Sequence, residues 1–237
     1  MTSENLSAPG PPGKTESVAA ARRYRQVRYV PPSGATEVVL VRHGESEEAD
    51  PERPFPLVDG RGDPKLSPLG REQAERVADR LQSTRVDAIY VTSLQRTAET
   101  AAPLAARLRL VPNVEPGLAE VRLGEWEGGL YRQRISEGDP VASEVFEQER
   151  WDVIPGAESN TSVATRVGSA IDRIVARHEG ERVVCFAHGG TIGAVLAICT
   201  GSRPFAFIGS DNAAISILVV SGPRWSLRGF NDRSHLD

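Results

Sequence analysis

Short apolar segments alternate with helical patterns along the chain from residue 36 onward. Residues 37–42 are mostly apolar and lie between polar flanks, as expected for a strand that is buried on both faces. Five later segments have the same short, apolar character and are also predicted as strands: 87–92, 110–114, 182–187, 214–220 and 224–230.

Helical spacing of apolar residues marks the segments between these strands. Ser67 and Pro68 supply an N-cap and a proline at the first helical position, and the helix after them has one apolar face. Ser93 is predicted to cap a second helix that ends near Leu108. Three further helices are expected: 140–151, 162–178 and 191–199.

The order of these elements predicts the fold class and the domain organisation. Strands that alternate with helices indicate an α/β fold, a three-layer sandwich whose mostly parallel central sheet carries helices on both faces. We predict one domain over residues 36–237. Residues 1–35 hold several prolines and no sustained apolar period, so we predict a flexible N-terminal extension there. Its five basic and two acidic side chains leave a specific anion-binding role open.

Composition narrows the classes of protein and the compartment. The chain has 237 residues, 39% of them hydrophobic, which is enough for a core that needs no disulfide or metal. Its net charge of −4 disfavours nucleic-acid binding, and no apolar run is long enough to span a membrane. The N-terminus has no apolar core followed by a small-residue cleavage site, so we expect a cytoplasmic protein.

The two cysteines, Cys185 and Cys199, each lie inside an apolar segment. Buried free thiols in a reducing cytosol are the favoured interpretation, and a structural disulfide is the alternative. The cysteine pair does not resemble a zinc site, and no two histidines have the spacing of metal ligands. We therefore expect no metal and no cofactor.

Basic side chains follow three of the predicted strands. Arg42 and His43 end the first, Arg96 lies just after the second, and His188 ends the strand at 182–187. Ligands of open α/β sheets bind outside the carboxyl ends of the strands, so these side chains are expected to converge on one pocket. Together with helix N-termini, they would bind a tetrahedral dianion such as phosphate. The other two histidines, His178 and His235, are interpreted as surface residues.

Six blocks of sequence, in order, resemble the histidine phosphatase superfamily, also called the phosphoglycerate mutase-like family, over about residues 36–230. The blocks are Val41-Arg42-His43-Gly44-Glu45-Ser46; Leu66-Ser67-Pro68-Leu69-Gly70 with Gln73-Ala74; Thr92-Ser93-Leu94-Gln95-Arg96-Thr97 with Glu99-Thr100-Ala101; Leu118-Ala119-Glu120 through Gly124-Glu125-Trp126-Glu127-Gly128; Pro155-Gly156-Ala157-Glu158-Ser159; and Ala187-His188-Gly189-Gly190.

This resemblance implies a catalytic mechanism. His43 would be the nucleophile whose Nε2 forms a phosphohistidine, with Nδ1–H donating to a nearby carbonyl to fix the tautomer. Glu120 would be the general acid and then the base that activates water, although by its spacing alone it would be a solvated loop carboxylate. The other implied catalytic and substrate-binding residues surround the phosphoryl group: Arg42, Arg96 and His188, with Ser46 and Gly189.

Within the family, the sequence favours a metal-independent phosphomonoester hydrolase. Cofactor-dependent mutases carry Asn six positions after the nucleophile, where this chain has Ala49. The loop that follows His43 is rich in acidic residues, which should repel the second phosphate of a mutase intermediate. Mutase-type phosphoryl transfer and binding of a phosphorylated partner remain as alternatives.

The sequence leaves the identity of the small phosphorylated metabolite open. The resemblance allows a homodimer, because dimers are common in the family. Trp126 and Trp151 would either line the pocket or pack in the core. The triplet Arg61-Gly62-Asp63, in a polar loop, matches an adhesion motif by chance.

Overall fold

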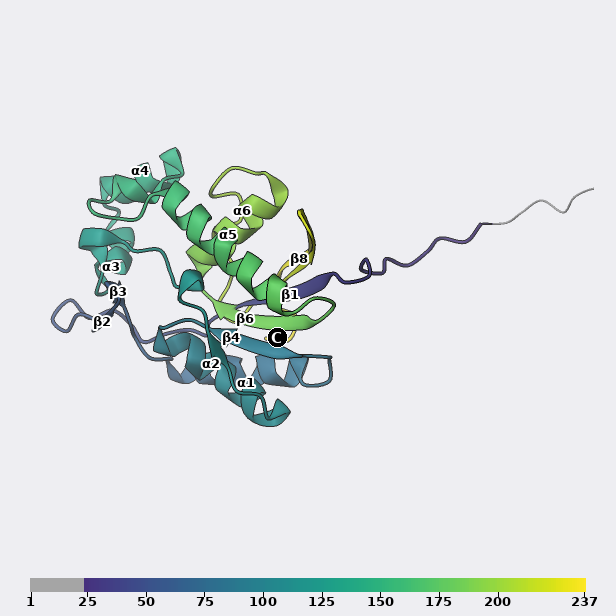
Figure 1. Ribbon diagram of the computed structural model, residues 1–237. Helices are drawn as coiled ribbons and strands as arrows, with labels where there is room; N and C mark the ends of the chain where they lie inside the picture. Colours follow the sequence, from purple (N-terminus) through teal and green to yellow (C-terminus); the bar gives the residue numbers. More distant parts are fainter. Residues whose placement is uncertain (1–23) are drawn as a thin grey trace, which may run out of the picture. The chain divides into compact units, whose positions relative to one another are not determined.

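The computed structural model describes residues 24–237 (Figure 1), of which residues 31–237 form one compact unit. Most of the N-terminal extension predicted over residues 1–35 therefore lies outside the described residues, since the description starts at Tyr24. Within the described part of the chain, no helix is long and apolar enough to cross a membrane.

A six-stranded sheet forms the centre of the compact unit, in the order β5-β4-β6-β1-β7-β8. Its strands are β1 (Thr36–Arg42), β4 (Ala88–Val91), β5 (Asn113–Val114), β6 (Arg182–Ala187), β7 (Ile215–Ser221) and β8 (Arg224–Asp232). The first four run parallel to one another, whereas β7 runs antiparallel to its neighbour β1, and β8 runs antiparallel to β7. The mostly parallel sheet is confirmed.

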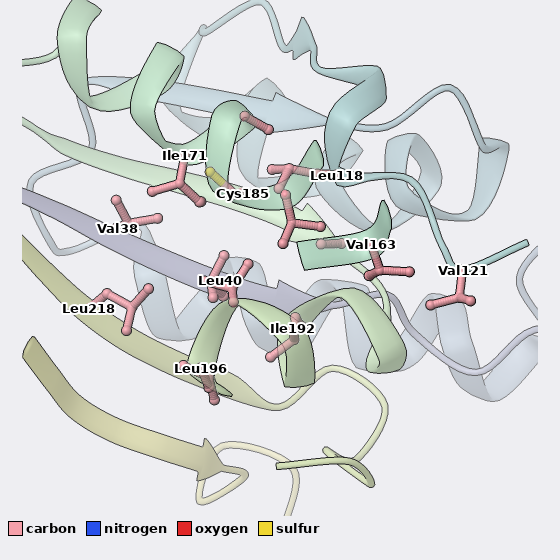
Figure 2. Close-up of a cluster of buried hydrophobic side chains, with 14 of the residues drawn as sticks. Val38, Leu40, Leu118, Val121, Val163, Ile171, Cys185, Ile192, Leu196 and Leu218 are labelled. Atoms are coloured by element: carbon pink, nitrogen blue, oxygen red, sulfur yellow. The ribbon is translucent and has the colours of Figure 1, made fainter. Parts of the chain in front are cut away.

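Helices cover both faces of this sheet, which gives the predicted three layers (Figure 1). Helices α1 (Pro68–Leu81) and α2 (Gln95–Leu108) share one apolar cluster with the sheet, and α5 (Asn160–Arg177) and α6 (Gly189–Thr200) share the other. Figure 2 shows the second cluster, where Leu40 of β1 lies among side chains of α5, α6 and β7. Burial on both faces explains why the strand segments are almost wholly apolar.

The two helices on the first face begin in different ways. Ser67 caps α1 as predicted, since its Oγ accepts the N–H of Gly70 at 3.0 Å. The prediction that Ser93 caps α2 is wrong, because its buried Oγ has no partner within residues 24–237. Asp63, 32 residues upstream, instead accepts the N–H of Gln95 at 2.8 Å. A cap from a distant loop has no local sequence signature.

Several short elements complete the fold, and only one of them, the helix that begins at Pro140, was predicted from the sequence. The polar loop contains a short hairpin, β2 (Leu57–Val58) and β3 (Arg61–Gly62). Helix α3 (Leu130–Glu137) has no fully buried residue, and its partly buried Leu130 and Tyr131 pack against the core. Three 3₁₀ turns and one further helix complete the set: η1 (Pro116–Leu118), η2 (Gly124–Trp126), η3 (Trp151–Val153) and α4 (Pro140–Gln148). The helix predicted at 140–151 ends early because Glu149 adopts a left-handed conformation, φ 53°.

Both cysteines are free thiols, as favoured over the disulfide. Cys185 is fully buried on β6, and Cys199 is half-buried near the end of α6. Burial raises the pKa of the Cys185 thiol far above its ordinary value, so this thiol stays protonated.

Candidate active site

Strands β1 and β6 end side by side and bring two histidines together. Arg42 is aligned with Ala187 across the parallel pair, and the N–H of His43 donates to the Ala187 carbonyl at 3.0 Å. His188, the residue after β6, therefore emerges beside His43, with ring centroids 5.2 Å apart. The register of a buried strand pair thus produces the convergence expected from the sequence.

The backbone around His43 fixes the tautomer of its ring. Nδ1 lies 2.7 Å from the carbonyl oxygen of its neighbour Gly44, a group that can only accept, so Nδ1 carries the proton. Nε2 is left with its lone pair. Burial lowers the pKa of His43 well below 6.5, and the charges of Arg96 and Arg42 lower it further. The ring is therefore neutral and has an unprotonated nitrogen available as a nucleophile.

Two arginines flank this nitrogen. Arg96, in the first turn of α2, has a side chain only 7% exposed; its Nη1 donates to the Gly62 carbonyl at 3.0 Å and lies 3.7 Å from Asp63. Burial lowers the pKa of Arg96 to about 10, which leaves it charged at neutral pH. Arg42 donates from Nη1 to the Ser210 carbonyl, and its buried Nε has no partner within residues 24–237. Its free donor is suited to a phosphoryl oxygen.

His188 is completely buried, and only one of its ring nitrogens has a partner. Nε2 lies 3.0 Å from Thr92 Oγ1, whereas the buried Nδ1 has no partner in the described part of the chain. Burial lowers the pKa of His188 well below 6.5. A buried polar atom without a partner is rare in a folded protein and is typical of a site that awaits a ligand.

Glu120 is not the solvated loop carboxylate that its spacing alone suggested. Its carboxylate lies at the N-terminus of α6, where Oε1 accepts the N–H of Thr191 at 3.2 Å and Oε2 that of Gly190 at 3.4 Å. A Cβ on Gly190 would lie 2.9 Å from Glu120 Oε1, so glycine is needed for this approach. The carboxylate is thereby fixed beside the pocket.

A cavity of about 270 Å³ is lined by Arg42, His43, Arg96 and Glu120, whereas the fully buried His188 is not part of its lining. Its charged lining residues are Arg42, Arg61, Arg96, Glu120, Glu127 and Arg132, with His43 at the base. Trp126 and Trp151 both line it while remaining buried, so both of their expected roles apply. The lining of the pocket therefore combines four arginines with two tryptophans.

The structure does not bring every expected residue to the cavity wall. Ser46 is buried outside the lining, and its Oγ accepts from Arg132 Nη2 at 2.6 Å. Gly189 also lies outside the lining but close behind Arg42: a Cβ there would be 3.4 Å from Nε. Ser46 thus acts on the pocket through Arg132, and Gly189 provides space for Arg42.

Sequence reasoning missed two cations of the pocket, Arg61 and Arg132. Arg61 belongs to the triplet that was attributed to chance, yet it lines the cavity and donates to the Glu120 carbonyl. Its one signal was a cation between two glycines, in a loop with more acidic than basic residues. Arg132 is on α3, and its guanidinium lies 5.3 Å above the Phe55 ring. The core-packing residues of α3, Leu130 and Tyr131, are adjacent in the sequence, so α3 shows no helical period.

The interpretation of the remaining histidines as surface residues is wrong. His178 is mostly buried, with Nε2 2.9 Å from the Tyr90 hydroxyl and Nδ1 2.6 Å from Glu181. His235 is half-buried, with Nε2 3.1 Å from the Ala213 carbonyl. Both rings make contacts within the fold. Residues 24–237 contain no cluster of three or more His, Cys, Asp or Glu arranged to hold a metal.

Comparisons with known proteins agree with this geometry. A family model of the histidine phosphatase superfamily (branch 1) matches residues 38–233. Phosphoglycerate mutase-like protein 4 of Arabidopsis thaliana is 35% identical over 208 residues, 85% of this chain and 87% of that protein. The metal-independent phosphoserine phosphatase of the same plant is 32% identical over 209 residues, 86% of this chain and 84% of that protein.

A solved structure gives the same picture. The mycobacterial glucosyl-3-phosphoglycerate phosphatase superposes with a TM-score of 0.70 at 29% identity, over 83% of this chain and 99% of that chain. The resemblance drawn from the six blocks of sequence is confirmed.

Proposed function

This chain belongs to the histidine phosphatase superfamily (branch 1), and we propose that it is a metal-independent phosphomonoester hydrolase acting through a phosphohistidine on His43. One observation carries the assignment of the nucleophile. A neutral, buried imidazole has its Nδ1–H tied to the Gly44 carbonyl and its Nε2 free beside two arginines, at the base of a cavity. A neutral nitrogen beside fixed cations is suited to attack on a phosphate dianion.

In the first step, His43 Nε2 attacks phosphorus and the P–O bond to the leaving group breaks. Arg42 and Arg96 stabilise the charge on the phosphoryl oxygens, and His188 adds a further donor when its ring proton is on Nδ1. Glu120, protonated in this state, gives its proton to the departing alkoxide. The products are the free alcohol, a phosphohistidine and the Glu120 carboxylate.

In the second step, the Glu120 carboxylate takes a proton from water as the water oxygen attacks phosphorus. The P–N bond breaks, inorganic phosphate leaves, and His43 recovers its neutral ring. Glu120 is protonated again and ready for the next ester. The α6 amides hold the carboxylate in place for both proton transfers.

The substrate is proposed to be a small phosphorylated metabolite. Two relatives are named for phosphoserine and for glucosyl-3-phosphoglycerate, phosphate esters that also carry a carboxylate. Arg132 at the pocket forms no ion pair with a carboxylate among residues 24–237, and its guanidinium is suited to such a group. We expect Arg132→Ala to raise KM for acidic phosphate esters more than for phenyl phosphate.

Phosphoglycerate mutase activity is the second candidate, because relatives carry that name. A mutase must retain a bisphosphorylated intermediate, which requires cations around the second phosphate. The loop after His43 instead presents Glu48 and Glu52 at its exposed surface, and Ala49 occupies the position of the mutase Asn. These features favour hydrolysis.

Phosphate release from an aryl phosphate, measured with excess chelator, tests the proposal. Wild type, His43→Ala and the control His178→Ala are compared, beside a coupled assay that interconverts 3- and 2-phosphoglycerate. We expect chelator-resistant release that is lost only in His43→Ala. Interconversion without net hydrolysis would favour the mutase, and silence in both assays would contradict both functions and favour binding of a phosphorylated partner.

Cytoplasmic localisation and a homodimer are also parts of this proposal. Two free cysteines are typical of a reducing compartment, and the family resemblance supports the dimer. Fractionation of cells and sedimentation equilibrium of the purified chain test them. Recovery outside the cytoplasm, or a monomer at micromolar concentration, would contradict them.

A further inference from the structure

Three charged side chains, the buried Glu158 and the partly buried Arg61 and Arg166, form a cluster next to Glu120. The Glu158 side chain is only 3% exposed, and Arg166 of α5 pairs with both of its oxygens: Nε to Oε1 at 2.8 Å and Nη2 to Oε2 at 3.0 Å. Arg61 Nη2 approaches the same carboxylate at 3.8 Å. One carboxylate therefore balances two guanidinium groups.

The other N–H groups of the two guanidinium groups donate to backbone carbonyls of residues 117–120. Arg166 Nη1 donates to the carbonyls of Gly117 and Ala119, at 2.9 and 2.7 Å. The Glu120 carbonyl accepts from Arg166 Nη2 at 3.1 Å and from Arg61 Nε at 2.5 Å. Two arginines therefore fix the backbone carbonyl of Glu120, the proposed general acid.

Glu158 is held in its ionised form by the same contacts. Burial alone would raise the pKa of Glu158, but hydrogen bonding and charge from Arg166, with the Ser162 hydroxyl, lower it below its ordinary value. Ser162 Oγ lies 2.9 Å from Oε1, and the Arg122 N–H lies 3.4 Å from Oε2. Every side of the carboxylate is occupied, so Arg166 has little freedom to move.

A proton donor works only when its oxygen lies within hydrogen-bond reach of the leaving group. Glu120 has a flexible side chain, and the α6 amides contact only its carboxylate end. The other end, its main chain, is fixed by the arginines. Fixing both ends restricts the carboxyl group to one position.

We propose that Glu158 and Arg166 are positioning residues for the general acid, which hold the Glu120 peptide so that its carboxyl group reaches the leaving-group oxygen. This inference rests on the proposed function, since it assigns Glu120 the proton transfer. Neither residue lines the cavity, and neither touches the phosphate-binding groups. Their loss should therefore impair proton donation and spare phosphate binding.

The leaving group separates these two effects. Nitrophenolate departs without a proton, whereas phenolate is more basic and needs one, and the two esters have nearly the same size. We expect Glu158→Gln to lower kcat/KM for phenyl phosphate about tenfold or more, a fraction of the full contribution of a general acid. The value for p-nitrophenyl phosphate should change less than about threefold, because kcat/KM reports only the steps up to departure of the leaving group.

The same helix provides a matched control. Arg173 of α5 pairs with buried Glu115 through two contacts, at 2.7 and 3.3 Å, and Glu115 accepts the Gly117 N–H, but this pair does not touch Glu120. Arg173→Gln should change both esters equally or not at all. Arg166→Lys, which keeps the charge and loses the fork, is a second variant in case Glu158→Gln does not fold, and should show a smaller loss of the same kind.

Distinct results overturn this inference and the function beneath it. Equal losses for the two esters in Glu158→Gln and Arg166→Lys, or the same selective loss in Arg173→Gln, would overturn the positioning role alone. A wild type that hydrolyses neither ester would overturn the proposed function and the inference with it. A loss confined to phenyl phosphate, with phosphate still bound as a competitive inhibitor, supports the positioning role.

Discussion

The protonation state of individual side chains decides what this pocket can do. His43 and His188 lie at the ends of adjacent strands with Arg42 and Arg96 beside them, and burial and positive charge both keep the imidazoles neutral. A neutral His43 is a nucleophile, and a neutral His188 can still donate one hydrogen bond. The backbone carbonyl of Gly44 selects the reactive nitrogen.

Neutral buried histidines make the folded state sensitive to acid. Below pH about 6.5 the unfolded chain binds protons at both rings, whereas the folded chain does not. Their lowered pKa values therefore leave stability intact above pH 6.5 and reduce it as the pH falls, by at most about 1.4 kcal/mol per pH unit for each ring. We expect His188→Gln to lose less stability than wild type between pH 7.5 and about 5.5. Urea denaturation measures this, and equal losses would contradict it.

Arg96 binds in a geometry that lysine cannot reproduce. Its guanidinium contacts Gly62 and Asp63 while it faces the pocket, which requires several donors in a plane. We expect Arg96→Lys to lower kcat/KM by about a hundredfold or more, the usual effect of removing a transition-state donor. Arg203, whose side chain is 79% exposed, provides the control, and Arg203→Lys should have no effect. Steady-state kinetics with phenyl phosphate measures kcat/KM for both variants.

At the scale of elements, close backbone contact holds α1 against the catalytic loop, the segment of residues 44–46 that follows His43. A Cβ on Gly70 would lie 1.9 Å from the Glu45 carbonyl oxygen, and one on Gly44 would lie 2.5 Å from the Gly70 oxygen. The Ser67 cap adds a further link, since its hydroxyl donates to Glu45 at 2.7 Å. The start of α1 therefore determines the path of the chain just after His43.

Two helical glycines should respond to alanine in opposite ways. Gly70→Ala forces backbone apart beside the catalytic loop, so we expect a loss of about 1–3 kcal/mol in the free energy of unfolding, together with lower activity. Gly168, inside α5, has space: its Cβ would lie 3.8 Å from Ile198. Gly168→Ala should stabilise the chain by about 0.5–1 kcal/mol without changing activity. Denaturant titration measures both, and a stable, fully active Gly70→Ala would contradict the close contact.

The elements that sequence patterns predict are those buried in the layers. Strands β1, β4 and β6 and helices α1 and α5 bury apolar residues at regular spacing, so their periodicity was visible. The β2–β3 hairpin and α3 have no fully buried residue and no regular apolar period, and contacts with distant segments hold them. The α2 cap failed for the same reason, because Asp63 reaches it from another loop.

The residues of the candidate site can be divided in the same way, into those on elements with a hydrophobic period and those on elements without one. His43, Arg96 and His188 follow predictable strands, so their convergence could be inferred from topology. Arg61 on β3 and Arg132 on α3 line the pocket from elements without a hydrophobic period, so the sequence pattern could not show that they face inward. Only the resemblance to a family, and not spacing, singled out Glu120.

For the whole molecule, charge is distributed to suit an anionic substrate. The chain carries a net charge of −4, yet the pocket gathers four arginines against two glutamates. One of the two glutamates, Glu127, already accepts hydrogen bonds from the N–H groups of Gly62 and Leu123. The pocket therefore attracts a phosphate dianion, while the negative remainder disfavours binding to nucleic acid.

The compact unit over residues 31–237 contains the whole pocket, and its core is buried within that unit. We therefore expect a variant comprising residues 31–237 to keep the Tm and the kcat/KM of the full chain. A variant starting at residue 41, which lacks most of β1, should not fold, because β1 pairs with both β6 and β7. Calorimetry and phosphatase kinetics test this. Loss of activity in the 31–237 variant, with Tm unchanged, would instead assign the basic extension a role in binding the substrate.

The central claim is that phosphate passes through a covalent bond to His43. The most direct measurement mixes the chain with p-nitrophenyl phosphate, quenches at alkaline pH, where phosphohistidine survives, and locates the phosphoryl group by peptide mass spectrometry. We predict a phosphoryl group on His43 in wild type, more of it in Glu120→Gln because the base that activates water is missing, and none in His43→Ala. Chelator-resistant hydrolysis that persists in His43→Ala, or a phosphoryl group on another residue, would contradict the account.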